Sequence, residues 1–398
     1  MSDPIELTEP ANPNTGRARK ALLRRLVDVV AMPSSAIAHS DRTMAGDVLL
    51  DMLLMIDEED RIYTAERLRK ASEAPKRLLL YLAICDFKVA KPLLEDNEGF
   101  DSSDLSDIAG RTGLAHRTQI AMRRSVPPSV GDALVASGEV PVIKRLLENE
   151  GAELSEATLD QIVAVSRDAE ELCLPLLGRR EVRAAQAMTL FWWADSQSRR
   201  VILQRHAADR SALIDRCSDV FPMASEENWS DPVVRKTLQL IERRQRNRLA
   251  IPKSPFDSLE EAVEAAAKNG LSAEVAQEIG YLSGVKPVTI AKIFDDRGGE
   301  GLAVLCKATG LKREYLALLW RALRRDLTDE NGKPDQLFQS LSETFESLPV
   351  GRAQTTLRYW NWSLSSAFSP KQLAKVDPAN DENQFSSARQ TARLVFGA

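Results

Sequence analysis

The chain repeats a short apolar motif at nearly regular intervals. Residues 89–95 read Val-Ala-Lys-Pro-Leu-Leu-Glu, residues 142–148 read Val-Ile-Lys-Arg-Leu-Leu-Glu, and residues 175–177 repeat the Pro-Leu-Leu core. A degenerate copy lies at 120–124, and a second apolar run follows each copy after a polar or proline break. A period of roughly 24–30 residues, in units too small to bury their own apolar faces, is typical of a stacked helical array.

The remaining sequence also favours helices. Leu23, Val27 and Val30 recur at helical spacing in a segment that starts near Ala18, and prolines stand mostly at expected helix starts and breaks. No stretch shows the sustained alternation of β-branched residues that indicates a strand. We therefore expect an all-α protein, with an irregular HEAT/armadillo-like helical array followed by a smaller helical domain.

Composition shifts suggest five regions. We expect a disordered N-terminus at 1–17, a helical-repeat array at 18–206, a connecting helix and basic linker at 207–256, a C-terminal helical domain at 257–345, and a mostly flexible tail with an aromatic docking segment at 346–398. Within the C-terminal domain, residues 279–287 and 305–313 share one pattern. Each predicts a helix, a Gly-apolar-Lys turn at Gly284 or Gly310, and a second helix.

Charge and cysteine content favour a cytoplasmic protein. The net charge is −5, which gives no overall attraction to nucleic acid or anionic lipid. The four cysteines are scattered without a CxxC motif, so we expect reduced thiols rather than disulfides or a metal site. The first residues lack the basic and apolar regions of a signal peptide, and no apolar run approaches the roughly 18 residues of a membrane span.

Several segments resemble an uncharacterised alphaproteobacterial family of helical-repeat proteins, catalogued as a domain of unknown function. The segments that carry the resemblance are 60–61, 65–68, 74–75, 114–117, 120–123, 142–149 and Phe191-Trp192-Trp193, within residues 45–325. The resemblance implies a bacterial cytosolic protein with HEAT/armadillo-like repeats. It implies no reaction and no functional residues.

The residues that could carry chemistry have simpler interpretations. His116-Arg117 lies in no recognisable metal or catalytic motif, so we expect a structural or capping role. Asp101, Asp104 and Asp107 share one helical face, where a helix N-terminus favours acidic residues. The Gly-rich segment 295–301 lacks the pattern of a phosphate-binding loop and is expected to connect two helices. We expect no cofactor and no enzymatic activity; a HEAT-like nucleic-acid-modifying enzyme is the remaining enzymatic alternative.

A basic helix is the first candidate binding element. Its cationic residues could contact an acidic partner or another anion, and are Arg235, Lys236, Arg243, Arg244, Arg246 and Arg248. The second candidate is an aromatic segment that could dock within the chain or on a partner, and its residues are Tyr359, Trp360 and Trp362.

These features predict a non-enzymatic interaction scaffold or regulator that binds a protein partner through its repeat surface and the basic helix. The alternative is a nucleic-acid-binding protein that uses the basic helix or the Gly-turn helix pairs. The second helix of the last pair is apolar around most of its circumference, which favours packing over base recognition. The sequence leaves the oligomeric state and the identity of the partner open.

Overall fold

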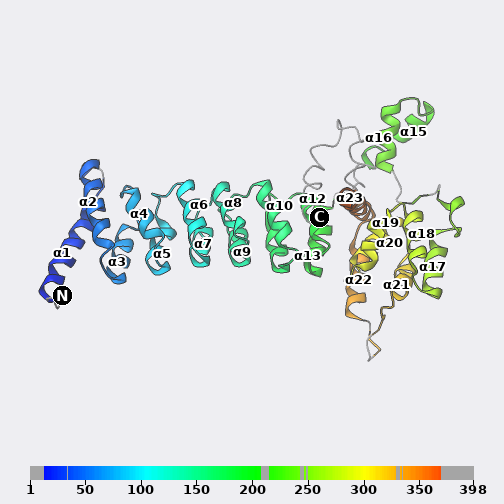
Figure 1. Ribbon diagram of the computed structural model, residues 1–398. Coiled ribbons are helices and arrows are strands. Elements are labelled where there is room, and N and C mark those ends of the chain that lie inside the picture. The colour runs from blue at the N-terminus through cyan, green and yellow to red at the C-terminus, as the bar shows by residue number, and fades with distance from the viewer. Residues whose placement is uncertain are drawn as a thin grey trace, which may run out of the picture. The chain divides into compact units, whose positions relative to one another are not determined.

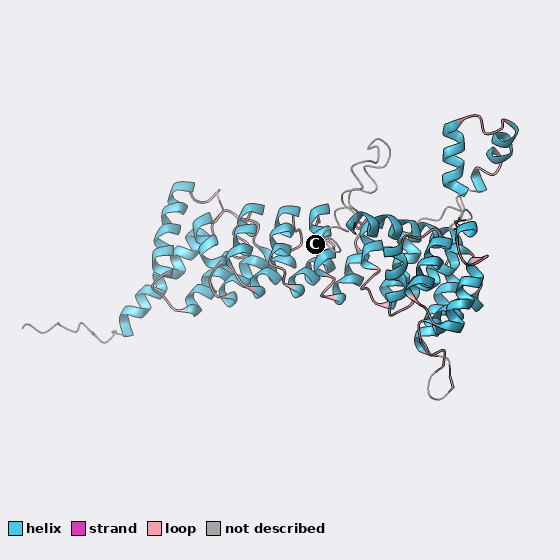
Figure 2. Ribbon diagram, turned by 45° about the vertical axis from the view of Figure 1, so that its right-hand side comes forward, coloured by secondary structure: helices cyan, strands magenta, loops and turns pink. Residues whose placement is uncertain are grey.

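The computed structural model describes residues 13–33, 35–207, 215–242, 246–247, 250–328, 332–333 and 335–368. These residues form helices and loops, with one isolated bridge between Val126 and Ala152 and no strand (Figure 2). The all-α prediction is confirmed. The expected disordered N-terminus lies mostly outside the described residues, although a helix begins at Pro13.

The described helices group into two compact units, which divide between Leu159 and Asp160. We call them unit 1 and unit 2. Unit 2 contains the last helices of the expected array together with the expected C-terminal domain.

Unit 1 is built from paired helices. They are α1 (Pro13–Val30), α2 (His39–Leu53), α3 (Glu58–Leu68), α4 (Lys76–Ala83), α5 (Phe87–Asp96), α6 (Ser102–Arg111), α7 (Leu114–Ala121), α8 (Pro128–Ala136) and α9 (Val140–Glu148). Helix α10 (Glu156–Val165) begins in unit 1 and ends in unit 2. The even-numbered helices α2 to α8 pack in sequence beside one another, and so do α3, α5, α7 and α9 (Figure 1).

The sequence repeats correspond to these pairs. The first two copies of the motif lie in α5 and α9, where Leu94 and Leu147 are both buried. The second apolar runs lie in the even-numbered helices, so each pair presents one apolar helix face to the other. Helices α4, α6 and α8 begin 26 residues apart, which agrees with the expected period.

Polar side chains connect consecutive pairs. Asn97, which ends α5, donates a 2.8 Å hydrogen bond to the Leu68 carbonyl at the end of α3. Asn149, which ends α9, donates a 2.8 Å bond to the Ala121 carbonyl at the end of α7. Arg123 lies between these two asparagines in the sequence, and its side chain donates hydrogen bonds to the carbonyls of Leu94 and Asn97. These bonds satisfy carbonyl groups that a helix leaves unpaired at its end.

Unit 2 continues with short helices and then a packed bundle. The short elements are η1 (Glu170–Leu172), α11 (Cys173–Gly178), α12 (Ala184–Leu190), α13 (Ser196–Val201) and the π-helix η2 (Ile202–His206). Then follow α15 (Val220–Glu226), α16 (Pro232–Glu242) and η3 (Ile251–Lys253). The bundle consists of α17 (Leu259–Asn269), α18 (Ala273–Ser283), α19 (Pro287–Asp295), α20 (Glu300–Thr309), α21 (Arg313–Ala322), α22 (Gln336–Ser347) and α23 (Val350–Phe368).

Helix α20 is the centre of this bundle and packs against α19, α21, α22 and α23. The two expected Gly turns join α18 to α19 and α20 to α21. Gly284 and Gly310 adopt left-handed φ values of 66° and 76°, which glycine tolerates without strain. After each, the next residue donates a backbone bond across the helix end, Val285 to Gly280 and Leu311 to Cys306. The predicted helix–turn–helix pattern is therefore present twice.

Candidate functional site

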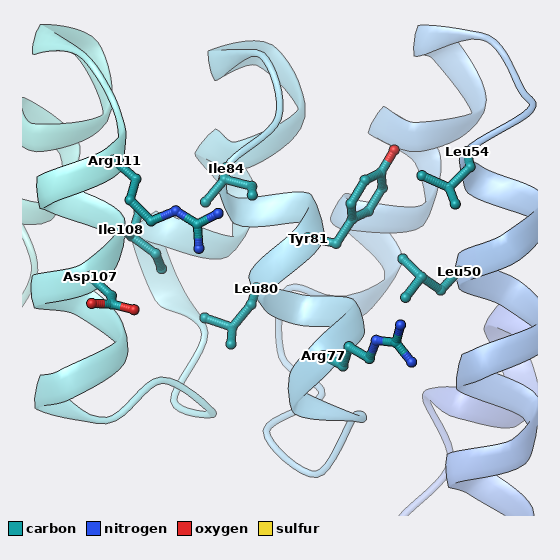
Figure 3. A pocket seen from close by; sticks show the side chains of 9 residues that line it. All are labelled: Leu50, Leu54, Arg77, Leu80, Tyr81, Ile84, Asp107, Ile108 and Arg111. Carbon is teal, nitrogen blue, oxygen red and sulfur yellow. The ribbon is translucent and has the colours of Figure 1, made fainter.

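An open groove crosses α2, α4 and α6 of unit 1 (Figure 3). Its volume is about 320 Å³. Its lining residues are Leu50, Leu54, Arg77, Leu80, Tyr81, Ile84, Asp107, Ile108 and Arg111. Six of these nine side chains are apolar or aromatic, so the groove suits a segment with apolar side chains.

Helix α2 and the turn that follows it carry further exposed apolar residues. Met44 and Val48 lie on α2, and Met55, which is 80% accessible, lies in the turn after Leu53; they recur at intervals of four and seven residues together with exposed Asp51. We call these four residues the outer stripe, and the groove and outer stripe together the α2–α4–α6 face. Single exposed apolar residues are common, but adjoining ones on neighbouring helices typically mark an interaction site.

Charged groups border the apolar residues. The closest nitrogen of Arg77 lies 3.8 Å from Asp47 on α2, which is a loose ion pair between exposed side chains. Arg111 is exposed and forms no ion pair with any described residue, and its guanidinium lies near Ile84 in Figure 3. Charges of both signs around an apolar floor are the usual pattern at the rim of an interface.

Burial affects the acidity of Tyr81 in the groove and of nearby Cys85. Tyr81 is half-buried, and its pKa is raised by burial and, to a lesser extent, by neighbouring Cys85. Burial likewise raises the pKa of the Cys85 thiol, which donates to the Tyr81 carbonyl. Both groups are therefore held in the protonated, less reactive form.

The basic helix is only partly described. Arg235 is exposed on α16, and Lys236 lies on the same helix, but its side chain is outside the described residues. Arg243, Arg244 and Arg248 are also outside them. Arg246 binds within the chain: it donates at 2.7 and 3.1 Å to the Glu260 carboxylate and at 2.5 Å to the Thr309 carbonyl. The hydrogen bond from Arg246 lowers the pKa of Glu260.

The aromatic segment lies on α23, inside the region expected to be mostly flexible. Trp360 is fully buried, with its ring centre 4.6 Å from Phe191 and 4.7 Å from Trp192, and its indole N–H donates to the Met188 carbonyl at 3.2 Å. Tyr359 is half-buried, and burial raises its pKa. The side chain of Trp362 and residues 369–398 lie outside the described residues. Trp360 thus joins α23 to α12 within unit 2.

His116 and Arg117 bind backbone carbonyls. The Nε2 atom of buried His116 lies 2.9 Å from the Cys85 carbonyl oxygen, and the Arg117 side chain donates at 2.7 Å to the Ala109 carbonyl near the end of α6. Asp101 and Asp104 form a reciprocal capping box at the start of α6. These contacts are structural and hold helix ends in place.

A buried charge cluster in unit 2 was not predicted. One guanidinium nitrogen of Arg199 lies 2.7 Å from both Asp296 and Glu300, and both carboxylates are 2% accessible. A Cβ on Gly298 would overlap Arg199 and Glu300, and one on Gly299 would overlap the Trp320 ring. The Gly-rich segment therefore connects two helices as expected, but it is closely packed around an ion pair.

The described residues contain no group of three His, Cys, Asp or Glu side chains that could hold a metal ion. The helices of the described part are too short or too polar to cross a membrane.

Comparison with known proteins identifies one family. A family model described as an uncharacterised protein conserved in bacteria (DUF2336) matches residues 89–358. No curated protein and no solved structure matches the chain. Helices α1 to α4 precede the matched region, so the α2–α4–α6 face includes residues on both sides of its start. Because the match covers more than half of the sequence, the chain belongs to this bacterial family, DUF2336.

Proposed function

We propose that the protein is a non-enzymatic interaction scaffold or regulator whose α2–α4–α6 face binds a protein segment. The observation that supports this most directly is that the groove and the exposed apolar residues of the outer stripe occur on neighbouring helices of unit 1. A stacked array of helix pairs offers such an extended surface because each pair contributes one helix to it.

The finer parts of the proposal come from the sequence. We propose that the paired helices are HEAT/armadillo-like repeats, that the family relationship is alphaproteobacterial, and that the protein acts in the cytoplasm. Exposed Arg235 on α16 supports a second, electrostatic contact with an acidic partner. Binding to nucleic acid remains the alternative, with less support, because Arg246 and Arg313 are paired with Glu260 and Glu346 within the chain.

A matched pair of variants tests the role of the face. Leu54 on the face and Met122 at the end of α7 are almost equally exposed, at 56% and 54%. We expect Leu54→Asp to abolish capture of a specific protein from bacterial lysate, and Met122→Asp to retain it. Nuclease treatment should leave capture unchanged, because the face binds apolar side chains rather than phosphates. Equal capture by both variants would refute the role of the face, and loss after nuclease would favour nucleic acid.

A further inference from the structure

We propose that the segment bound by the α2–α4–α6 face is the outer stripe of α2 in a second copy of this chain. The inference rests on the proposed function, because it names the partner of the same face. It follows from the complementary chemistry of two surfaces on neighbouring helices of unit 1.

The first surface is the outer stripe. Met44, Val48 and Asp51 on α2 and Met55 in the turn directly after it follow one another at steps of four, three and four residues, which is the spacing of a helix seam that packs against other helices. Met44 is 65% exposed, so the stripe lacks such a partner within the described residues. The stripe therefore presents apolar side chains together with the carboxylate of Asp51, and Asp47 beside it faces Arg77 of the same chain.

The second surface is the part of the groove formed by α4 and α6. Leu80, Tyr81 and Ile84 provide its apolar floor, and the guanidinium groups of Arg77 and Arg111 border it. Asp107 also lines the groove, and Arg77 already faces Asp47 of its own chain at 3.8 Å. Arg111 is exposed and has no ion pair with a described residue, so a segment with apolar side chains and a carboxylate matches the groove at Arg111, where desolvation strengthens the pair. A cationic helix would be repelled by Arg111, and an anionic membrane would be repelled by Asp51.

Both surfaces occur once on every copy, the stripe on α2 and the groove on α4 and α6, and these helices pack beside one another in that order. If the stripe of one copy occupies the groove of another, the stripe of the second can occupy the groove of the first. Such an arrangement is self-complementary and closes as a two-fold dimer rather than a filament. The contact buries the apolar side chains at the centre and leaves the charged pairs at the edge, as in other specific interfaces.

Charge reversal tests the pairing of α2 with α6. The measurement is sedimentation equilibrium of the full-length chain, with circular dichroism to check folding. We expect the wild type to dimerise, and both Asp51→Arg and Arg111→Asp to weaken the dimer by about tenfold or more, because each places like charges together. An equimolar mixture of the two variants should recover dimerisation, since each then supplies the charge that the other needs. Met55→Asp should also weaken the dimer, whereas Met122→Asp should leave it unchanged.

The outcomes separate this inference from the proposed function. Recovery in the mixture supports the second copy as the occupant. A wild type that stays monomeric at all concentrations, or variants that fail to recover when mixed, overturns it. If the chain is monomeric but captures another protein in a Leu54-dependent manner, the proposed function stands and the inference fails. If the chain dimerises but neither charge reversal weakens the dimer, and Leu54→Asp does not affect capture, the inference and the proposed function both fail.

Discussion

Replacing Arg199 by methionine should destabilise unit 2 far more than breaking an equally short ion pair at the surface. Arg199 lies 2.7 Å from both Asp296 and Glu300, and its Nε also donates to the Ala194 carbonyl at 2.8 Å. The substitution leaves two buried carboxylates without the cation that pairs with both of them. Removing one partner of a buried ion pair typically costs about 3–5 kcal/mol, a large part of a total stability of roughly 5–15 kcal/mol.

The matched control is Arg313→Met. Arg313 lies 2.8 Å from Glu346, but both side chains are 60% accessible, so water solvates the remaining carboxylate. Exposed pairs contribute about 0–1 kcal/mol, and the difference between the two variants therefore measures burial rather than distance. A third variant, with Asp296→Asn and Glu300→Gln added to Arg199→Met, should recover part of the loss because it removes the unpaired charges.

Urea denaturation followed by tryptophan fluorescence is the appropriate assay. All six tryptophans lie in unit 2, so fluorescence reports on that unit, whereas circular dichroism reports on both. We expect Arg199→Met to lower the urea concentration at the midpoint of unfolding. The slope of the free energy of unfolding against urea concentration should stay unchanged. A loss of stability no greater than that of Arg313→Met would refute the argument that the cluster is held by desolvated charge.

Three further predictions concern packing and reactivity. Leu147→Ala should cost about 2–5 kcal/mol by circular dichroism, because the side chain is buried in the array; a negligible loss would contradict the stacked repeat. Gly151→Ala should destabilise unit 1 because its Cβ would overlap the Arg124 carbonyl, whereas Gly110→Ala in α6 meets open space and should stabilise it by about 0.5–1 kcal/mol; equal effects would contradict the backbone contact. Burial raises the pKa of Cys306 to about 12, so its thiol should resist alkylation at about pH 8 until urea unfolds unit 2; labelling in the folded state would show that the site is open.

Local patterns in the sequence predicted much of the fold. The motif at 89–95 and 142–148 identified α5 and α9, and the glycines at 284 and 310 identified two helix ends. These features depend on neighbouring residues, such as apolar spacing along a helix or a left-handed φ, so a sequence expresses them directly.

Contacts between distant residues could not be predicted in the same way. Arg199 and Glu300 are 101 residues apart, and nothing near either residue identifies its partner. The charge excess around Arg246 suggested an external anion, but Glu260 and Thr309 of the same chain bind its side chain. The α2–α4–α6 face was also missed, because Met44 and Ile84 could equally have been core residues until neighbouring helices were placed.

The hydrogen bonds of Asn97, Arg123 and Asn149 restrict how this array can change length in evolution. Each side chain reaches carbonyls of the preceding pair, so a short insertion or deletion between two pairs would break the bonds on one side. Removing or duplicating one whole unit of 26 residues would instead bring a similar side chain to a similar helix end. Relatives of this chain should therefore differ in length by complete helix pairs within unit 1 and by smaller steps in loops that carry no such bond.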